Sequence, residues 1–445
     1  MRYQFERRRW PATTSVVTCA VLIAGMILCS FAGAQDADED EDFSWDWGSL
    51  GGFGYFNFRN SLFVDREPDS PGNLSEDWGE FFIKPWVSFE YAAGAGVLYG
   101  KASWVYSKTG ENAADISGGG ASSSDLDDFW VAWTSGEVDG DGFGLGAGRY
   151  PYVIANQFLL SDGYADGGSR AGYWSNPRRA WKKAAAGFYE GHGHHVSAFY
   201  LRRDEQPESD TDTRISGINY EWTSAGDRWQ LGASYLATEA NELAAQRDGA
   251  DIINLRVYTT PFDAPFTVEA EWVDEDNGLA LQANAWYIQP YWTFEHLSWK
   301  PVLYYRYAYF EGDDPDTPAN ENYDPLFPGF YDWGSWWQGE IAGEYFLSNS
   351  NLKTHMLRLH TTPTDRISTG LLFFDYTLDQ PGSYQGGVIS DEIGQEINWY
   401  MDWKFHKYFS VSFVLARTQP GKAVEEAHDR SKDFKYGMIY FGLDY

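Results

Sequence analysis

Basic side chains concentrated between positions 149 and 183 are the residues of this chain best suited to bind a ligand. This local excess of basic residues contrasts with the overall composition of the sequence, which has 65 acidic and 33 basic residues. Guanidinium groups bind carboxylates through two parallel hydrogen bonds, so a ring of them around a passage would select anions. The alternative is that these cations pair with nearby carboxylates and only hold a folded-in loop. The residues are Arg149, Arg170, Arg178, Arg179, Lys182 and Lys183.

Patterns for catalysis or tight metal binding are weak. No serine or acid stands with a histidine at matched positions, so we expect no enzyme. His192, His194 and His195 fall in a short predicted turn without a cysteine or clear carboxylate partner, so we expect no zinc site. Three acidic clusters carry oxygen ligands suited to calcium but lack EF-hand spacing. We interpret them as solvated external loops and expect no cofactor; calcium, or cations bridging to lipopolysaccharide, is the alternative. The clusters are Glu311–Asp316, Asp274–Gly278 and Asp125–Asp128.

The amino terminus predicts export. Arginines at positions 2 and 7–9 precede an apolar run from Val16 to Phe31, and Ala32-Gly33-Ala34 offers small residues for cleavage before Gln35. A lipoprotein site at Cys29 is the competing interpretation. Both cysteines lie in this segment, so the mature chain would form no disulfide and no thiolate metal site. Cleavage would also remove four arginines and one glutamate, which leaves 29 basic and 64 acidic residues and a net charge of −35.

Composition then narrows the class of protein. The acidic charge argues against nucleic acid, whose phosphates need basic partners. The chain is 18% aromatic, contains 46 glycines and has a low mean hydropathy. This profile is typical of a transmembrane β-barrel, in which only alternate residues meet lipid. A secreted β-sandwich array or a β-propeller is the structural alternative.

Alternating apolar and polar residues predict strands with one buried face. In 83–91, Ile83 and Val87 would face lipid while Lys84 would face the lumen, with Pro85 removing one ladder donor. Segments 253–258 and 265–272 show the same pattern, and Asn254 would also point inward.

Connections between the predicted strands alternate in length, as in a barrel with short periplasmic turns and long external loops. An even strand number, with both termini in the periplasm, requires Trp336–Phe346 to lie in an external loop, where a short helix is one form it could take. The last strand alternates back from a terminal aromatic, Tyr445, which resembles the signal read by the barrel-assembly machinery.

We therefore predict an all-β protein of the bacterial outer membrane, a single antiparallel barrel of about 18 strands in contact with the lipid bilayer and lipopolysaccharide. Residues 1–34 would be the signal peptide, 35–50 an acidic flexible periplasmic leader, and 51–445 the barrel. A barrel of this size leaves an aqueous channel.

Additional cations fall on predicted inward registers of the barrel wall. Because aromatic residues also form the interfacial girdles of such barrels, Trp299, Tyr305, Tyr307 and Tyr309 would face lipid. Trp174 and Trp181, inside the basic loop, are the better candidates for contact with a sugar. The wall cations are Arg256, Lys300, Arg306 and Arg358.

The basic loop resembles the alginate-export family of outer-membrane channels. The resemblance rests on Gly148-Arg149 and on Trp174-Ser175-Asn176-Pro177-Arg178-Arg179-Ala180-Trp181, and loosely on segments 346–376 and 396–404. It implies an 18-stranded monomeric channel with arginines lining a constriction. The family has an acidic residue where this chain has Lys182, which leaves the substrate open.

From this resemblance we expect passive diffusion of an anionic or neutral polysaccharide or oligosaccharide. A general or cation-preferring porin for small solutes is the alternative, because the net charge of −35 would reverse the selectivity if carboxylates line the lumen. A surface adhesin with a plugged outer face is a third class.

Overall fold

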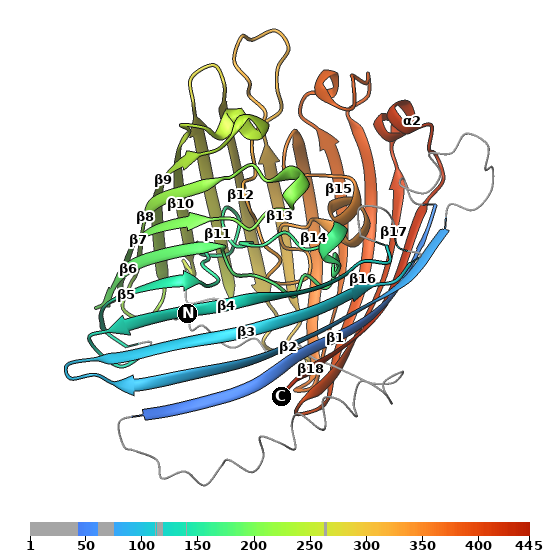
Figure 1. The fold of residues 1–445 in the computed structure, drawn as a ribbon. Helices are drawn as coiled ribbons and strands as arrows, with labels where there is room; N and C mark the ends of the chain where they lie inside the picture. Colours follow the sequence, from blue (N-terminus) through green and yellow to red (C-terminus); the bar gives the residue numbers. More distant parts are fainter. Residues whose placement is uncertain (1–42, 61–74, 112, 114–118, 139, 262–264) are drawn as a thin grey trace.

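The chain forms a closed antiparallel barrel (Figure 1). The computed structural model describes residues 43–60, 75–111, 113, 119–138, 140–261 and 265–445. Over these residues each of 18 strands pairs with the next, and β1 also pairs with β18. The strands are β1 Phe43–Arg59, β2 Ser75–Ala92, β3 Val97–Thr109, β4 Ser122–Thr134, β5 Gly142–Arg149, β6 Lys183–Gly191, β7 His194–Arg202, β8 Arg214–Thr223, β9 Trp229–Glu239, β10 Asp251–Thr259, β11 Phe266–Asp276, β12 Gln282–Thr293, β13 Val302–Phe310, β14 Leu352–Thr364, β15 Ile367–Leu378, β16 Glu392–His406, β17 Phe409–Pro420 and β18 Phe434–Asp444.

Short helices occur in the connections between strands. They are η2 Gly168–Arg170, η3 Pro207–Ser209, η4 Glu242–Arg247, η5 Gly339–Gly343, η6 Pro381–Ser383 and α2 Lys422–His428. The element η5 lies inside the segment Trp336–Phe346, which confirms that this segment is a helical part of a loop rather than a strand. Within the described residues no helix is long and apolar enough to cross a membrane.

Residues alternate between the two faces of the wall as the period-2 pattern predicts. In β10, Ile253 and Leu255 are 45% and 48% exposed on the outside, whereas Asn254 between them is buried. Lys84 of β2 is buried on the inner side, and Val87 is exposed. A large exposed apolar surface is unfavourable in water but suits the hydrocarbon of a bilayer.

The loop-length prediction is also confirmed, with three local differences. Asp125–Asp128 lies in β4 and Asp274–Asp276 at the end of β11, so these acidic clusters are not loops. The connection of residues 277–281 between β11 and β12 is short, although it stands at the long-loop end. Trp299 and Lys300 lie in the turn between β12 and β13, so neither is on a strand face.

The ends of the barrel differ from the sequence-based boundaries at one position. β1 begins at Phe43 rather than at residue 51, because Trp45 and Trp47 alternate with polar residues and pair with β2 from Phe43↔Tyr91 onward. The predicted signal peptide and the first part of the leader, residues 1–42, lie outside the described residues. At the other end, the Tyr445 amide donates to the Ser49 carbonyl at 3.1 Å, and the barrel closes there.

Candidate pore constriction

Two long connections fold into the barrel and touch each other. Residues 150–182 join β5 to β6, and residues 311–351 join β13 to β14. They form a parallel bridge between Leu160 and Phe327, where the Ser161 amide donates to the Phe327 carbonyl at 2.8 Å. Leu160 is fully buried and Phe327 nearly so. We call this pair of connections the inner loops; where they meet, they narrow the lumen.

Carboxylates of the barrel wall hold the inner loops in place. Glu80 accepts hydrogen bonds from the Trp174 and Ser175 amides at 3.3 and 3.0 Å. Asp127 accepts from the Arg179 and Ala180 amides at 3.0 and 2.9 Å. These contacts satisfy backbone donors that would otherwise be buried without a partner. Part of the acidic charge of the chain therefore serves to anchor the loops.

Glu396 does the same for the second inner loop. Its carboxylate accepts from the Ile341 and Ala342 amides of η5 at 3.0 and 2.8 Å, and from Asn398 and Thr418 at 2.7 Å each. Four donors on one carboxylate leave it little capacity to bind a solute.

Three of the predicted basic residues gather around one aspartate rather than around an open passage. Arg149 lies 2.8 Å from Asp204, Arg170 3.0 Å and Lys182 3.7 Å. Burial by itself would raise the pKa of Asp204, but the hydrogen bond from Arg149 and the charges of Arg149, Arg170 and Lys182 outweigh it and lower the pKa. Asp204 therefore stays ionised at neutral pH and ties the basic loop to the β7–β8 connection.

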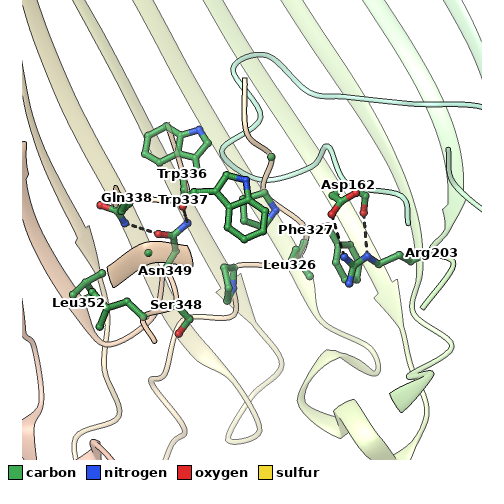
Figure 2. A pocket seen from close by; sticks show the side chains of 15 residues that line it. Asp162, Arg203, Leu326, Phe327, Trp336, Trp337, Gln338, Ser348, Asn349 and Leu352 are labelled. Carbon is green, nitrogen blue, oxygen red and sulfur yellow. Dashed lines mark hydrogen bonds and ion pairs between the residues drawn. The ribbon is translucent and has the colours of Figure 1, made fainter. Parts of the chain in front are cut away.

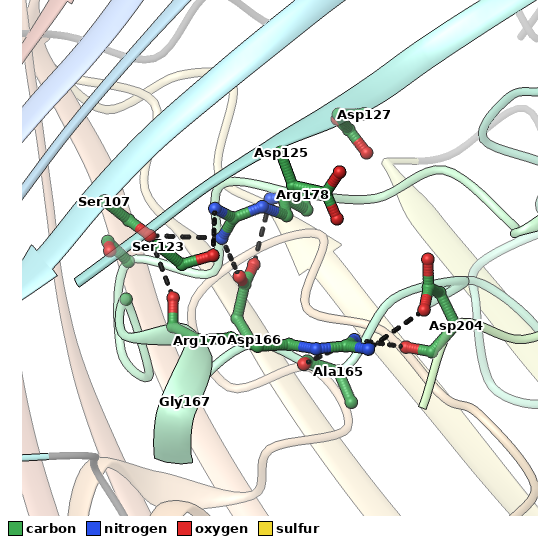
Figure 3. A network of polar contacts seen from close by, with 12 residues as sticks. Ser107, Ser123, Asp125, Asp127, Ala165, Asp166, Gly167, Arg170, Arg178 and Asp204 are labelled. Atoms are coloured by element: carbon green, nitrogen blue, oxygen red, sulfur yellow. Dashed lines mark hydrogen bonds and ion pairs between the residues drawn. The ribbon is translucent and has the colours of Figure 1, made fainter. Parts of the chain in front are cut away.

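Arg178 is completely buried at the contact between the loop and the wall (Figure 3). Its guanidinium pairs with Asp166 and donates to Ser107 and Ser123 at 3.1 and 3.3 Å. Tyr164 packs against the same guanidinium, 5.2 Å from its ring centre. Arg178 is thus an ion-paired residue that helps to hold the folded-in loop. This agrees with the alternative interpretation, in which the basic residues pair with carboxylates instead of lining a passage.

Arg179 and Lys183 are more accessible. The Arg179 side chain is half-buried and, among the residues that the structure describes, makes no ion pair. Lys183 is the first residue of β6 and is exposed on the outward register, where Tyr189 follows it. The prediction that Lys183 lines the lumen is therefore wrong, as it is for Lys300 in its exposed turn.

The three remaining wall cations point inward, as predicted, but all have partners. Arg256 donates to Ser234 at 2.8 Å and lies 3.4 Å from Glu221. Arg306 donates to the carbonyls of Gly334 and Ser335 in the second inner loop at 2.7 and 3.0 Å.

Arg358, the third, pairs with Asp332 of the same loop at 2.8 Å and donates to Tyr400 at 2.6 Å. Two of the inward arginines thus hold the second inner loop to the wall.

Both tryptophans of the basic loop pack against protein, Trp181 completely and Trp174 in part. Trp181 is fully buried against Phe327, with ring centres 5.7 Å apart, and its indole donates to the Tyr152 carbonyl. Trp174 packs between Phe56 and Tyr440, at 5.2 and 5.1 Å. Their role in this structure is to pack the loop against its surroundings.

A cavity of about 220 Å³ lies where three connections converge (Figure 2). Asp162 comes from the first inner loop, Arg203 from the β7–β8 connection, and Phe327, Trp337 and Asn349 from the second inner loop. The Arg203 guanidinium lies 4.4 Å from the Phe327 ring centre and donates to the Asp162 carbonyl at 3.0 Å. The cavity combines aromatic and charged surfaces of the kind that ligand sites use.

Sequence reasoning missed this cavity. Arg203 directly follows the last residue of β7, and no local pattern in the sequence pairs it with Phe327. The acidic cluster Asp125–Asp128 likewise has an unpredicted partner, because Asp128 lies 3.4 Å from Lys84 and 3.6 Å from Lys101 inside the barrel. Within the described part of the chain, no group of acidic, histidine or cysteine side chains could hold a metal ion.

Comparison with known proteins rests on structure. No protein-family model and no curated protein matches this chain. Solved outer-membrane channels do match: OpdK of Pseudomonas aeruginosa, determined with vanillate, has a TM-score of 0.57 at 12% identity and covers 90% of this chain and 99% of its own. The OccK2 (OpdF) complex with glucuronate from the same organism has a TM-score of 0.53 at 14% identity and covers 91% and 97%.

OccAB4 of Acinetobacter baumannii has a TM-score of 0.57 at 10% identity and covers 92% and 100%. The fold is that of the outer-membrane porins. The predicted barrel class is confirmed, and the outer-membrane location agrees with the fold and with the apolar outer face. The resemblance to the alginate-export family receives no support from these comparisons.

Proposed function

We propose that this chain is a passive outer-membrane channel for small hydrophilic solutes, without catalytic activity. The observation that carries the proposal is the contact of the two inner loops through Leu160 and Phe327 in the middle of a closed barrel. A barrel of this size would otherwise leave a wide aqueous pore. Loops that meet inside it favour small solutes over a polymer chain, so the porin alternative is preferred to polysaccharide export.

The charges at the constriction support a preference for cations. Most cations of the basic loop and of the inner wall are already paired, as in Arg178 of the loop with Asp166 and Arg358 of β14 with Asp332. The chain as a whole is strongly acidic, with a formal net charge of −32. Two of the structural neighbours were solved with vanillate and with glucuronate, which are small ring-bearing carboxylates. These ligands support the proposed size of the solute rather than its charge.

The test is the reversal potential of the refolded barrel in a planar bilayer under a potassium chloride gradient, with Arg179→Ala beside the wild type. We expect single-channel conductance and a cation preference that the substitution leaves nearly unchanged. Anion preference that disappears in Arg179→Ala would overturn the cation preference and restore an arginine constriction. Absence of conductance would overturn the channel itself and favour an adhesin with a plugged outer face.

A further inference from the structure

Three tyrosines of the inner wall lie side by side near the short-turn end of the barrel. Tyr258 is the last residue but one of β10, Tyr291 is two residues before the end of β12, and Tyr304 is two residues after the start of β13. All three are on inward registers and half-buried. We call them the tyrosine row. Because they face the lumen, contact with lipid does not account for them.

The row is continuous across the strands. The hydroxyls of Tyr258 and Tyr291 lie 3.2 Å apart, and the rings of Tyr291 and Tyr304 pack with centres 4.8 Å apart. Glu269 of β11 stands between them as the register partner of both Tyr258 and Gln289. Gln289 donates to one oxygen of Glu269 at 3.2 Å, and the carboxyl group keeps further acceptor capacity.

The second inner loop places the row immediately beyond the constriction. Arg306, one inward position from Tyr304 toward the long-loop end, is where the wall contacts Gly334 and Ser335 of that loop. Tyr304 is therefore the next inward side chain of β13 on the short-turn side of this contact. A solute that passes the inner loops meets the tyrosine row next.

The charges around the row select among ring-shaped solutes. Of the described cations, the two nearest along the wall are engaged. Arg306 donates to loop carbonyls, and Arg358 pairs with Asp332 while its guanidinium lies 5.3 Å from the Tyr304 ring centre. The side chain beside the row with spare hydrogen-bonding capacity is an acid, Glu269. Aromatic faces with polar edges suit the C–H faces and hydroxyls of a sugar, and an acid with no spare cation disfavours a carboxylate solute.

We propose that the tyrosine row, together with Glu269, binds the rings of neutral sugars as they leave the constriction. The inference rests on the proposed channel function and adds a substrate class and a site to it. It moves the sugar contact predicted at Trp174 and Trp181 to residues that face the lumen.

The experiment measures blocking of the ion current by maltotriose in planar bilayers. Wild type is compared with Tyr291→Leu/Tyr304→Leu, which keeps apolar volume but removes both flat faces, and with Tyr305→Leu, the adjacent residue on the lipid side. We expect the double variant to bind maltotriose about tenfold more weakly, since about 1.4 kcal/mol corresponds to one decade. Tyr305→Leu should block like the wild type.

Equal blocking in the wild type and the double variant would overturn the inference, and so would blocking by glucuronate but not by maltotriose. Glu269→Gln keeps the size of the side chain and serves as a second variant if the double variant does not fold; we expect weaker blocking there too. If the barrel conducts no ions, the channel function fails, and calorimetric titration of maltotriose into the refolded barrel still compares the same variants.

Discussion

Arg178 and Arg179 are adjacent in sequence and occupy opposite environments. Arg178 is fully buried with Asp166. Arg179 has a half-buried side chain, and its backbone amide donates to Asp127. A buried ion pair is weak evidence for stability, but removal of one member leaves the other charge without compensation. The two arginines therefore have different consequences when they are replaced.

We predict that Arg178→Ala releases the first inner loop and that Arg179→Ala does not. The unpaired Asp166 should destabilise the docked loop by roughly 3–5 kcal/mol. Limited proteolysis of the refolded barrel should show faster cleavage within residues 150–182 in Arg178→Ala only, and its single-channel current should be noisier. Equal cleavage rates in both variants would show that Arg178, with its partners Asp166 in the loop and Ser107 and Ser123 in the wall, does not hold the loop.

At the scale of elements, η5 is held by one carboxylate from the wall. Glu396 is almost fully buried and accepts the amides of Ile341 and Ala342. Because these donors belong to an inner loop surrounded by protein, no strand partner satisfies them. The same arrangement at Glu80 and Asp127 makes the inner loops dependent on a few acidic side chains of the wall.

Glu396→Gln tests this dependence. The side-chain nitrogen of glutamine cannot accept, so at least one donor should lose its partner at a cost of about 1–3 kcal/mol. Hydrogen exchange at the Ile341 and Ala342 amides should therefore accelerate by about tenfold or more. Glu392→Gln is the control, because Glu392 is exposed and lies 3.7 Å from an exposed Lys422. Unchanged exchange in Glu396→Gln would contradict the anchoring role.

At the scale of the whole molecule, the outer face of the barrel is apolar on nearly every strand. Leu415, in the middle of β17, is 60% exposed, and its neighbours across the pairs are Trp399 and Gly437. Exposure of this kind is stable only in an apolar solvent. The inner face in contrast carries polar groups and the inner loops. The outer face therefore suits the hydrocarbon of a bilayer, and the inner face suits water.

Leu415→Arg should lower the free energy of unfolding in a lipid bilayer by roughly 1–2 kcal/mol, less than the cost of arginine at the midplane, because the exposed Arg417 already follows two residues further along the same face. Leu243→Arg is the matched control, because Leu243 is 68% exposed in the η4 segment of a connection rather than on a strand. Urea titration of the folded barrel in vesicles measures both. A cost of the same size at Leu243 would mean that the effect is not specific to lipid contact.

The sequence by itself determined the features that repeat along neighbouring residues. Period-2 alternation predicts the strands and the inward direction of Asn254 and Lys84, and the alternation of turns with loops predicts an even number near 18, as observed. These properties are local. The alternation of residues within a strand indicates which side chains share a face, and the number of residues between two strands gives the length of their connection. The sequence-based prediction starts the barrel too late, because it continues the acidic leader to residue 50 and so includes Trp45 and Trp47 of β1 in it.

Only the tertiary structure decided what the basic loop does. The burial of Arg178, the packing of Trp181 on Phe327 and the cavity at Arg203 all depend on segments far apart in the chain. A loop that enters a barrel can meet any wall strand, and no periodicity specifies which carboxylate will bind a given cation. The tyrosine row also depends on tertiary structure, because the register in which β10 to β13 pair brings its members together.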